Sequence, residues 1–506
     1  MRKPIRILLV GFLCLGTVPV AAQNSHDLIC KFETVGMTGT GNNAPFWHTS
    51  NRQGLPSVKN SNGYMHVAAL GNMSQPGGLG IGYGIDLGGG AGLQSDWFVH
   101  QLYADLNYRW VGVSAGMKER WNDKNRSLSS GALTWSGNSR PLPEIRAGIP
   151  EYVRIPSMGG WLSVKGHLGY GRLTDDSWRK GRVDKAGMYV QGALFHTKSG
   201  FLRVGDAERF PLQFTFGLEM NNMFGGVLYK AGTEKQMPQD TKAFLTVLFP
   251  FHQIENQGTE DGDNFGSWHI SFDYDLNDWH MYAYYEHFYE DHSSMLGVEY
   301  KNNTQGEKEF IRFGFHRNWL DGLYGLEVNA PADIRFFRNA VFEFLNTRNL
   351  CGSIRHSATD NVEGMQVIEE VDGRDDMYNH MIYTSDTHWG YTMGSPVLIS
   401  PVYNTDKSNR LRSNRVQMFH LGIDGGITDN IDYRFLATTT RHWGCYGYPL
   451  DDVERVTSVM LECSYRLGDS YSWKFTLSGA MDIDSGDLIG NNKGIMLTIS
   501  KLWKVI

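Results

Sequence analysis

The sequence has few cysteines, and none of them belongs to a recognisable metal or redox motif. Cys14 lies near the N-terminus, whereas Cys30, Cys351, Cys445 and Cys463 are far apart with no C-x-x-C spacing, so neither a zinc site nor a dithiol redox centre is indicated. Whether any of the last four cysteines form disulfides is left open, because spacing alone cannot pair them. Cys463 continues the apolar face of an expected strand, which favours a small buried hydrophobe at that position.

The chain also lacks a large excess of charge of either sign. Its 47 basic and 54 acidic side chains give a net charge of −7 at pH 7. A protein that binds nucleic acid presents a basic face or stripe. The mild and mixed charge therefore argues against nucleic acid as a partner.

Catalytic and metal-binding motifs are missing as well. No G-x-S-x-G nucleophile elbow stands between a strand and a helix, and the 17 histidines include no H-E-x-x-H pair. The acidic turn 482–487 lacks the Glu that closes an EF-hand, and the polar cluster 287–292 is more typical of a solvated loop than of a metal site. The sequence predicts no catalytic residue, no metal and no cofactor.

Beyond the N-terminus, no apolar run is long enough for a membrane-spanning helix. Arg2, Lys3 and Arg6 precede an apolar run over 7–20, and Ala22 ends a small-residue stretch. This order is typical of a secretory signal peptide. We therefore expect an exported chain that is cleaved after Ala22.

What the chain has in abundance is period-two alternation. Over 268–276, even positions are apolar and odd positions are polar, which predicts a strand with one apolar and one polar face. The same alternation recurs at 98–108, 162–170, 279–289, 459–467 and 471–478. Aromatic residues lie toward the strand ends, as in the interfacial girdles of membrane barrels; they include Trp279, Tyr289, Trp473 and Trp503.

These patterns predict an all-β fold, a large antiparallel outer-membrane β-barrel of about 16–18 strands. A soluble sandwich of two sheets is the alternative that alternation alone leaves open. We expect a signal peptide over 1–22, a loop-rich N-terminal segment over 23–62 and the barrel over 63–506. The acidic run 356–378 is expected to be a solvated loop.

One Pro-rich segment, 121–166, interrupts the alternation. It holds four of the 16 prolines (Pro141, Pro143, Pro150 and Pro156), which argues against a long helix or a central strand. We expect an irregular segment folded into the barrel lumen or over its mouth. Its candidate contacts with sugar combine an aromatic ring with planar polar groups: Trp121, Asn122, Asp123, Arg140, Glu144, Arg146 and Arg154. The same groups could instead satisfy one another while plugging the lumen.

The segment also carries a resemblance. Its pieces Trp-Asn-Asp at 121–123, Ser-Leu-Ser-Ser-Gly at 127–131, Arg-Pro-Leu-Pro at 140–143 and Gly-Ile-Pro-Glu-Tyr at 148–152 resemble the capsule-assembly Wzi family of outer-membrane proteins, in its Bacteroides-like form. Supporting pieces include Ala-Pro-Phe-Trp at 44–47 and Gly-Ser-Pro at 394–396. The resemblance spans nearly the whole mature chain.

The resemblance implies a non-enzymatic lectin in the outer membrane that holds capsular polysaccharide at the cell surface. Its expected partners are that polysaccharide and the lipid around the barrel. Two other functions stay open from the sequence. One is a channel or porin in which 121–166 constricts the lumen, and the other is an outer-membrane enzyme acting on lipid or glycan.

Overall fold

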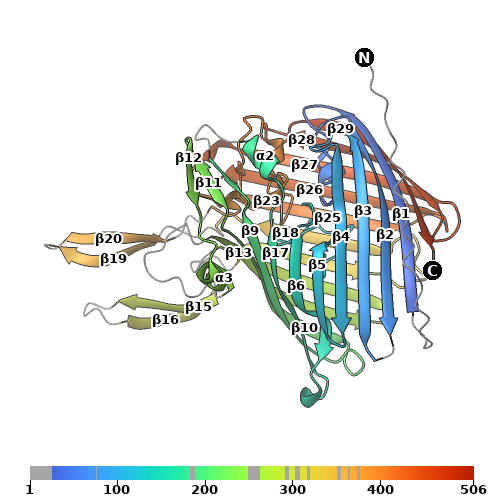
Figure 1. Cartoon of the computed structure of the whole chain (residues 1–506), viewed down its shortest axis with the longest axis horizontal. Coiled ribbons are helices and arrows are strands. Elements are labelled where there is room, and N and C mark those ends of the chain that lie inside the picture. The colour runs from blue at the N-terminus through green and yellow to red at the C-terminus, as the bar shows by residue number, and fades with distance from the viewer. Residues whose placement is uncertain are drawn as a thin grey trace.

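The computed structural model describes residues 25–75, 77–182, 188–248, 262–290, 296–302, 308–315, 320–349, 355–362, 365–372 and 376–506. Eighteen antiparallel strands close into a single barrel (Figure 1). This confirms the predicted outer-membrane barrel and the predicted strand number. The expected signal peptide over 1–22 lies outside the described residues.

The barrel strands follow one another around the wall in chain order. They are β1 (Ser25–Thr40), β2 (Asn62–Gln75), β3 (Leu79–Ala91), β4 (Trp97–Tyr108), β5 (Val111–Met117), β6 (Pro143–Arg154), β7 (Leu162–Arg172), β9 (Leu194–Val204), β10 (Leu212–Phe224), β13 (Asp263–Leu276), β14 (Trp279–Tyr289), β17 (Gly322–Asn329), β18 (Asn339–Asn346), β25 (Val416–Gly426), β26 (Ile431–Gly444), β27 (Pro449–Arg466), β28 (Trp473–Asp484) and β29 (Asn492–Lys504). The barrel closes where β1 pairs with β29, from Ile29 opposite Lys504 to Thr40 opposite Lys493.

Shorter elements lie in the connections between the barrel strands. The helices are α1 (Phe46–Thr49), α2 (Asp176–Lys180) and α3 (Thr241–Leu248), with 3-10 turns η1 (Pro156–Met158) and η4 (Pro401–Tyr403). The small sheets are β8 (Tyr189–Gln191) with β11 (Val227–Lys230) and β12 (Thr233–Gln236), and the pairs β15 (Leu296–Asn302) with β16 (Lys308–Phe315), β19 (Arg355–Val362) with β20 (Met365–Asp372), β21 (Asn379–His380) with β22 (Thr384–Ser385), and β23 (Thr387–His388) with β24 (Tyr391–Thr392). Among the described residues, no helix is long and apolar enough to span a membrane.

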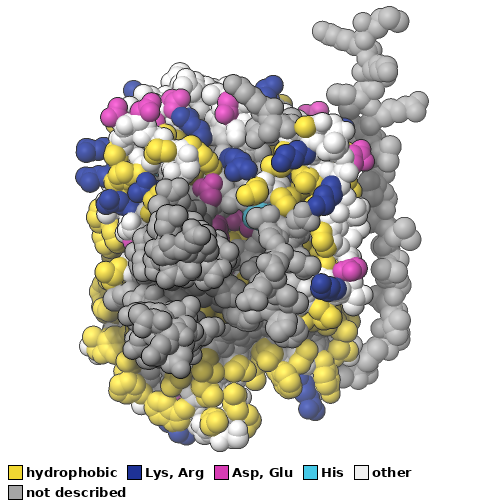
Figure 2. Space-filling model, turned by 90° about the vertical axis from the view of Figure 1, so that its left-hand side faces the viewer, with side chains coloured by type: hydrophobic (Ala, Val, Ile, Leu, Met, Phe, Trp, Pro, Cys, Tyr) yellow, Lys and Arg dark blue, Asp and Glu magenta, His cyan; other side chains and the backbone are white. Residues whose placement is uncertain are grey.

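Alternating side chains explain why the wall forms. Along β28, odd positions such as Leu477 and Ile483 are 55% and 56% exposed, whereas the polar side chains Ser478 and Asp482 between them are buried. The apolar face therefore points outward, toward lipid, and the polar face points into the lumen. Figure 2 shows hydrophobic side chains over the lower part of the molecule, and charged side chains gathered above, where α2, β11 and β12 lie in Figure 1.

The two ends of the barrel differ in the length of their connections. At one end, strands are joined by short turns such as 109–110, 277–278 and 427–430, and the described chain ends lie there too, with the Val505 N–H donating to the Leu28 carbonyl at 2.8 Å. At the other end, the connections include 41–61, 118–142 and 347–415. Outer-membrane barrels have short periplasmic turns and longer outer loops. We therefore name these the inner end and the outer end.

Three connections from the outer end fill the lumen, namely 41–61, 118–142 and 376–415, and we name them together the plug. They share one apolar core with the wall: plug residues Trp47, Leu133 and Met393 pack in the same cluster as wall residues Val341 and Met418. Burial of that core fixes the plug inside the barrel.

The structure corrects two predicted boundaries. Ser25–Thr40 is the first barrel strand and not part of a loop-rich segment over 23–62. Its alternation is blurred because Val35 and Met37 are apolar but face inward, where they pack beside Leu55 and Phe98.

The predicted irregular segment 121–166 is irregular only as far as Leu142, because β6 begins at Pro143. Pro143 is the first residue of the strand, and Pro150 lies where the register shifts between Ile149 and Val153. A strand start and a bulge are the two places where a barrel strand tolerates proline. The part inside the lumen, 118–142, confirms the predicted placement.

Three smaller expectations were also wrong. Part of the acidic run 356–378 forms the hairpin of β19 and β20. Tyr289 is buried beside Met220, so it is not a girdle residue, whereas Trp473 and Trp503 are 38% and 36% exposed. Cys463 is exposed and unpaired, as Cys30 and Cys445 are unpaired, while Cys351 lies outside the described residues.

Candidate functional site

Three glutamates of the wall bind the backbone of the plug. The Glu286 carboxylate on β14 accepts a hydrogen bond from the Leu133 N–H at 2.8 Å. Glu327 on β17 accepts one from the Asn125 N–H, and Glu343 on β18 accepts one from the Ser130 N–H, each at 2.7 Å. Hydrogen bonds to charged groups are stronger than neutral ones, and stronger still where water is excluded. These three strands therefore set the position of 118–142 in the lumen.

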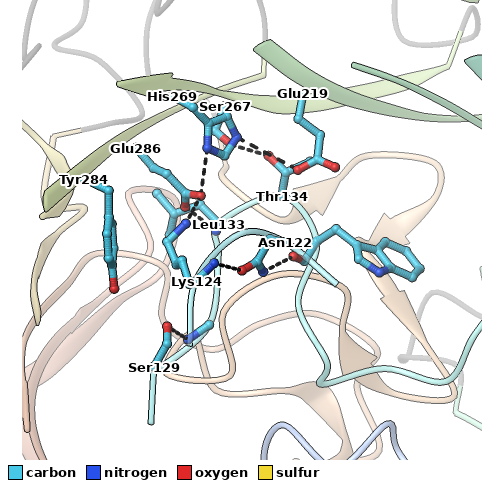
Figure 3. Close-up of polar contacts among 12 residues, drawn as sticks. Asn122, Lys124, Ser129, Leu133, Thr134, Glu219, Ser267, His269, Tyr284 and Glu286 are labelled. Atoms are coloured by element: carbon cyan, nitrogen blue, oxygen red, sulfur yellow. Dashed lines mark hydrogen bonds and ion pairs between the residues drawn. The ribbon is translucent and has the colours of Figure 1, made fainter. Parts of the chain in front are cut away.

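A chain of polar contacts reinforces the bond to Glu286 (Figure 3). The Lys124 ammonium is ion-paired with Glu286, and both side chains are nearly inaccessible. His269 Nδ1 lies 3.0 Å from the same carboxylate, while its Nε2 lies 3.1 Å from the Ser267 hydroxyl. Ser267 in turn contacts the Thr134 hydroxyl of the plug at 2.5 Å. The segment 118–142 is thus held by an ion pair at Lys124 and by a hydroxyl–hydroxyl contact at Thr134.

The other two plug segments are bonded in the same way. The Phe46 N–H donates to Asp482 of β28 at 2.9 Å. Within the plug, the Ser136 hydroxyl donates to the Gly394 carbonyl at 2.7 Å, and the Tyr378 hydroxyl donates to the Leu133 carbonyl. The Thr49 and Tyr403 hydroxyls, 2.7 Å apart, join 41–61 to 376–415, so the three segments form one hydrogen-bonded body.

Two buried histidines of the plug are neutral in the folded protein. Burial lowers the pKa of His388 to about 4, and burial together with the nearby Arg52 charge lowers the pKa of His48 to about 3. The neutral His388 ring donates from Nδ1 to the Arg140 carbonyl at 2.9 Å and contacts the Thr174 hydroxyl through Nε2 at 2.9 Å.

These two histidines predict a pH dependence. In the unfolded chain a histidine takes up a proton near pH 6.5, whereas the folded plug excludes it down to about pH 4. Stability is therefore complete above about pH 6.5 and falls by up to ~1.4 kcal/mol per histidine for each pH unit below it. The thermal unfolding midpoint should fall between pH 7 and pH 5, and less so in H48Q/H388Q. An equal fall in both proteins would contradict this.

Four of the predicted contact residues form hydrogen bonds or ion pairs with other residues of the plug or the wall. Asn122 donates to the Trp135 carbonyl at 3.1 Å and accepts from the Lys124 N–H at 3.0 Å. Arg140 is buried, donates to the Gly54 carbonyl at 3.1 Å and stacks over Trp389 at 4.8 Å.

Glu144 and Arg146 lie on β6, where Glu144 Oε1 is 3.0 Å from the Nε of Arg146 and from that of Arg120. This cluster faces the lumen, because Ile145 between the two residues is 65% exposed on the outer surface.

The remaining three make contacts with different partners. Trp121 is partly buried, with the Arg126 guanidinium 5.0 Å from its ring centroid. Arg154 lies at the inner end, 3.3 Å from Glu208. Asp123 accepts a hydrogen bond from the Lys165 ammonium at 2.8 Å. The seven residues do not converge on one site.

Asp123 lines a polar lumen cavity of about 380 Å³ together with Lys124, Arg203, Asp273, His280, Tyr282 and Glu327. Burial alone would raise the pKa of Asp123, but the Lys165 ammonium holds it below its ordinary value. A second cavity of about 370 Å³ lies between plug and wall and is lined by Arg52, Ser127, Arg434, Glu462 and Lys474, among others. Ionised groups of both signs line each cavity, which suits hydroxyl-rich ligands.

Sequence reasoning missed the three wall glutamates. Only Glu286 lies in a segment, 279–289, for which alternation predicts a strand, and nothing in the sequence sets it apart from the other polar residues. Only the fold brings Glu343 beside Ser130 and Glu327 beside Asn125.

Comparison with known proteins identifies the fold. A scan against protein-family models and a search of curated proteins find no match. Among solved structures, the chain is similar to Wzi of Escherichia coli, a carbohydrate-binding β-barrel involved in group 1 capsule assembly, with a TM-score of 0.55 and 13% identity over 93% of this chain and 83% of that one. OccK2 (OpdF) of Pseudomonas aeruginosa gives a TM-score of 0.46 and 10% identity over 95% and 98% of the two chains. OprD of the same organism gives 0.42 and 8% over 96% of each.

Proposed function

We propose that this chain is a non-enzymatic outer-membrane protein that binds capsular polysaccharide and assists its assembly or retention at the cell surface. The observation that carries the proposal is the plug, whose three segments are bonded to the wall and to one another inside the lumen. A lumen filled in this way argues against an open channel, and it leaves the polar cavities and the outer surface of the barrel for binding a polymer. The barrel fold shared with the carbohydrate-binding Wzi supports the same function.

Capsule partition tests the proposal. The gene is deleted, and polysaccharide is measured on washed cells and in the medium with a capsule-directed antibody. Unchanged total polysaccharide with a shift into the medium is the expected result. An unchanged partition would overturn the proposal.

Planar-bilayer recording distinguishes the alternative function, a channel. We expect the purified barrel to be electrically silent, whereas a steady conductance would support a channel instead. Turnover of labelled capsule or lipid by the purified protein would contradict the non-enzymatic assignment.

Among the predicted contact residues, Asp123 is the one that lines either of the two lumen cavities described above. We propose that Asp123 contacts the sugar directly, with its carboxylate accepting hydrogen bonds from sugar hydroxyls. D123A is expected to weaken polysaccharide binding by about tenfold, the effect of losing one hydrogen bond to a charged group. D333A is the matched control, because Asp333, in the connection 330–338, is an exposed carboxylate that lines neither cavity. Equal affinities of D123A and the native protein would remove Asp123 from the site.

A further inference from the structure

Four arginines lie at the outer ends of four neighbouring strands. Arg348 follows β18, Arg415 precedes β25, Arg441 lies near the end of β26, and Arg455 lies in the outer half of β27, opposite Arg441. These strands are adjacent in the wall (Figure 1). We name the four residues the rim arginines.

All four side chains point away from the lumen. The strand neighbours of Arg441 and Arg455, His442 and Val456, are buried on the inner face, and successive side chains of a strand point to opposite faces. Arg415 directly precedes the buried Val416 at the start of β25, and Arg348 lies over Trp443, which shares the outward face of β26 with Arg441. Arg348, Arg441 and Arg455 are exposed, and Arg415 is partly exposed.

The rim arginines have no acidic partner among the described residues. By contrast, Arg338 is paired with Asp432 at 2.7 Å and Arg434 with Glu462 at 2.9 Å. Arg441 instead lies directly opposite Arg455 in the register, an arrangement that is destabilising for like charges. A row of cations without counter-charge is a binding surface for an anion.

Aromatic rings hold two of the guanidinium groups in place. Arg348 lies 4.5 Å from the ring centroid of Trp443, and Arg415 lies 4.3 Å from that of Tyr446. The Arg415 Nε–H and the Tyr446 hydroxyl both donate to the Arg348 carbonyl, at 3.1 and 3.4 Å. Because these contacts use the ring faces and one N–H, the forked ends of the guanidinium groups stay available for a ligand.

The height of the rim arginines along the barrel axis indicates the source of the anion that they would bind. Toward the inner end, the next outward side chains are the polar Asn346, Gln417, Thr439 and Thr457. Beyond them the outward side chains are apolar, with Phe342 at 52%, Phe419 at 48% and Leu461 at 58% exposure. Tyr465 lies near the inner end of β27, and the stretch from Arg455 to Tyr465 measures about 33 Å along the strand, or ~25 Å along the membrane normal for a strand tilted by about 40°. This equals the height of the apolar band of an outer-membrane barrel, about 25 Å. The rim arginines therefore lie at the level of the outer headgroups.

We propose that the rim arginines bind the phosphate groups of an outer-leaflet glycolipid. Guanidinium forks bind phosphate oxygens in a bidentate manner, and Trp443 is placed as tryptophans are at membrane interfaces. The bound phosphate would supply the counter-charge that Arg441 and Arg455 lack. This site is separate from the plug and does not depend on polysaccharide binding.

Lipid binding to the full chain in detergent tests the proposal, with diphosphoryl lipid A and its dephosphorylated form as probes and native mass spectrometry as readout. The native protein should retain the phosphorylated probe. R441A/R455A should bind it about 30-fold more weakly, because each arginine near an anionic lipid surface strengthens binding about fivefold. R441K/R455K should give an intermediate affinity, since lysine keeps the charge but lacks the fork. The matched control is R109A/R335A, which removes two exposed arginines at the inner end.

Several results would overturn the proposal. They are equal binding of the two probes to the native protein, an unchanged affinity of R441A/R455A, and an equal loss in the control variant. Soluble polygalacturonate is measured in parallel. A loss of its binding in R441A/R455A, with lipid A binding unchanged, would assign the row to an acidic polysaccharide instead. A thermal unfolding midpoint in detergent that is equal to or above that of the native protein shows that the variant is folded, because the variant loses the like-charge pair.

Discussion

Alanine at Glu286 is expected to loosen the plug more than any other single replacement. Its carboxylate is ion-paired with Lys124 and accepts the Leu133 N–H at 2.8 Å. Removing it leaves a buried ammonium group without a partner, which costs about 3–5 kcal/mol of folding free energy. The expected result for E286A is rapid proteolytic cleavage within 118–142 and a lower unfolding midpoint in detergent.

The double variant K124M/E286Q is the control for this prediction. It removes both charges, and the glutamine oxygen can still accept the Leu133 N–H. Replacing both partners of a buried ion pair by neutral groups costs much less than removing one of them. The double variant should therefore be closer to the native protein than E286A. If it is as labile as E286A, the unpaired ammonium is not the cause.

The second large effect is expected from removal of the central plug segment. Met117 and Pro143 lie opposite each other in the pairing of β5 with β6, so a short Gly-Ser turn can replace 118–142 without disturbing either strand. Barrels of 16–18 strands leave an aqueous channel when nothing fills them. The shortened protein should give a steady conductance in planar bilayers, whereas the native protein should be silent.

N122A serves as a matched control for the shortened protein. It removes the bonds of Asn122 to Trp135 and Lys124 but keeps all three wall glutamates, so it should stay silent. A silent shortened protein would show that 41–61 and 376–415 close the lumen alone. Capsule partition in the same strain shows whether 118–142 is needed for polysaccharide retention.

The wall could be predicted from the sequence because strand faces are a local property. In β28, Leu477 and Ile483 alternate with Ser478 and Asp482 within one continuous stretch, and such a stretch is stable only between lipid and a polar lumen. The pattern fails where the lumen face is itself apolar, as at Val35 and Met37 of β1. In that part of the sequence the alternation is lost, and the strand is not recognised.

The sequence by itself determined that the chain is a barrel of outer-membrane type, that polar groups line its lumen, and that a Pro-rich stretch interrupts the wall. Only the tertiary structure decided what that stretch does. In the structure, Pro143 and Pro150 belong to a strand, and the backbone N–H groups of Leu133 and Phe46 donate to Glu286 and Asp482. The reason is physical: alternation depends on neighbours along one strand, whereas these contacts depend on how eighteen strands close, which brings together residues far apart in the chain.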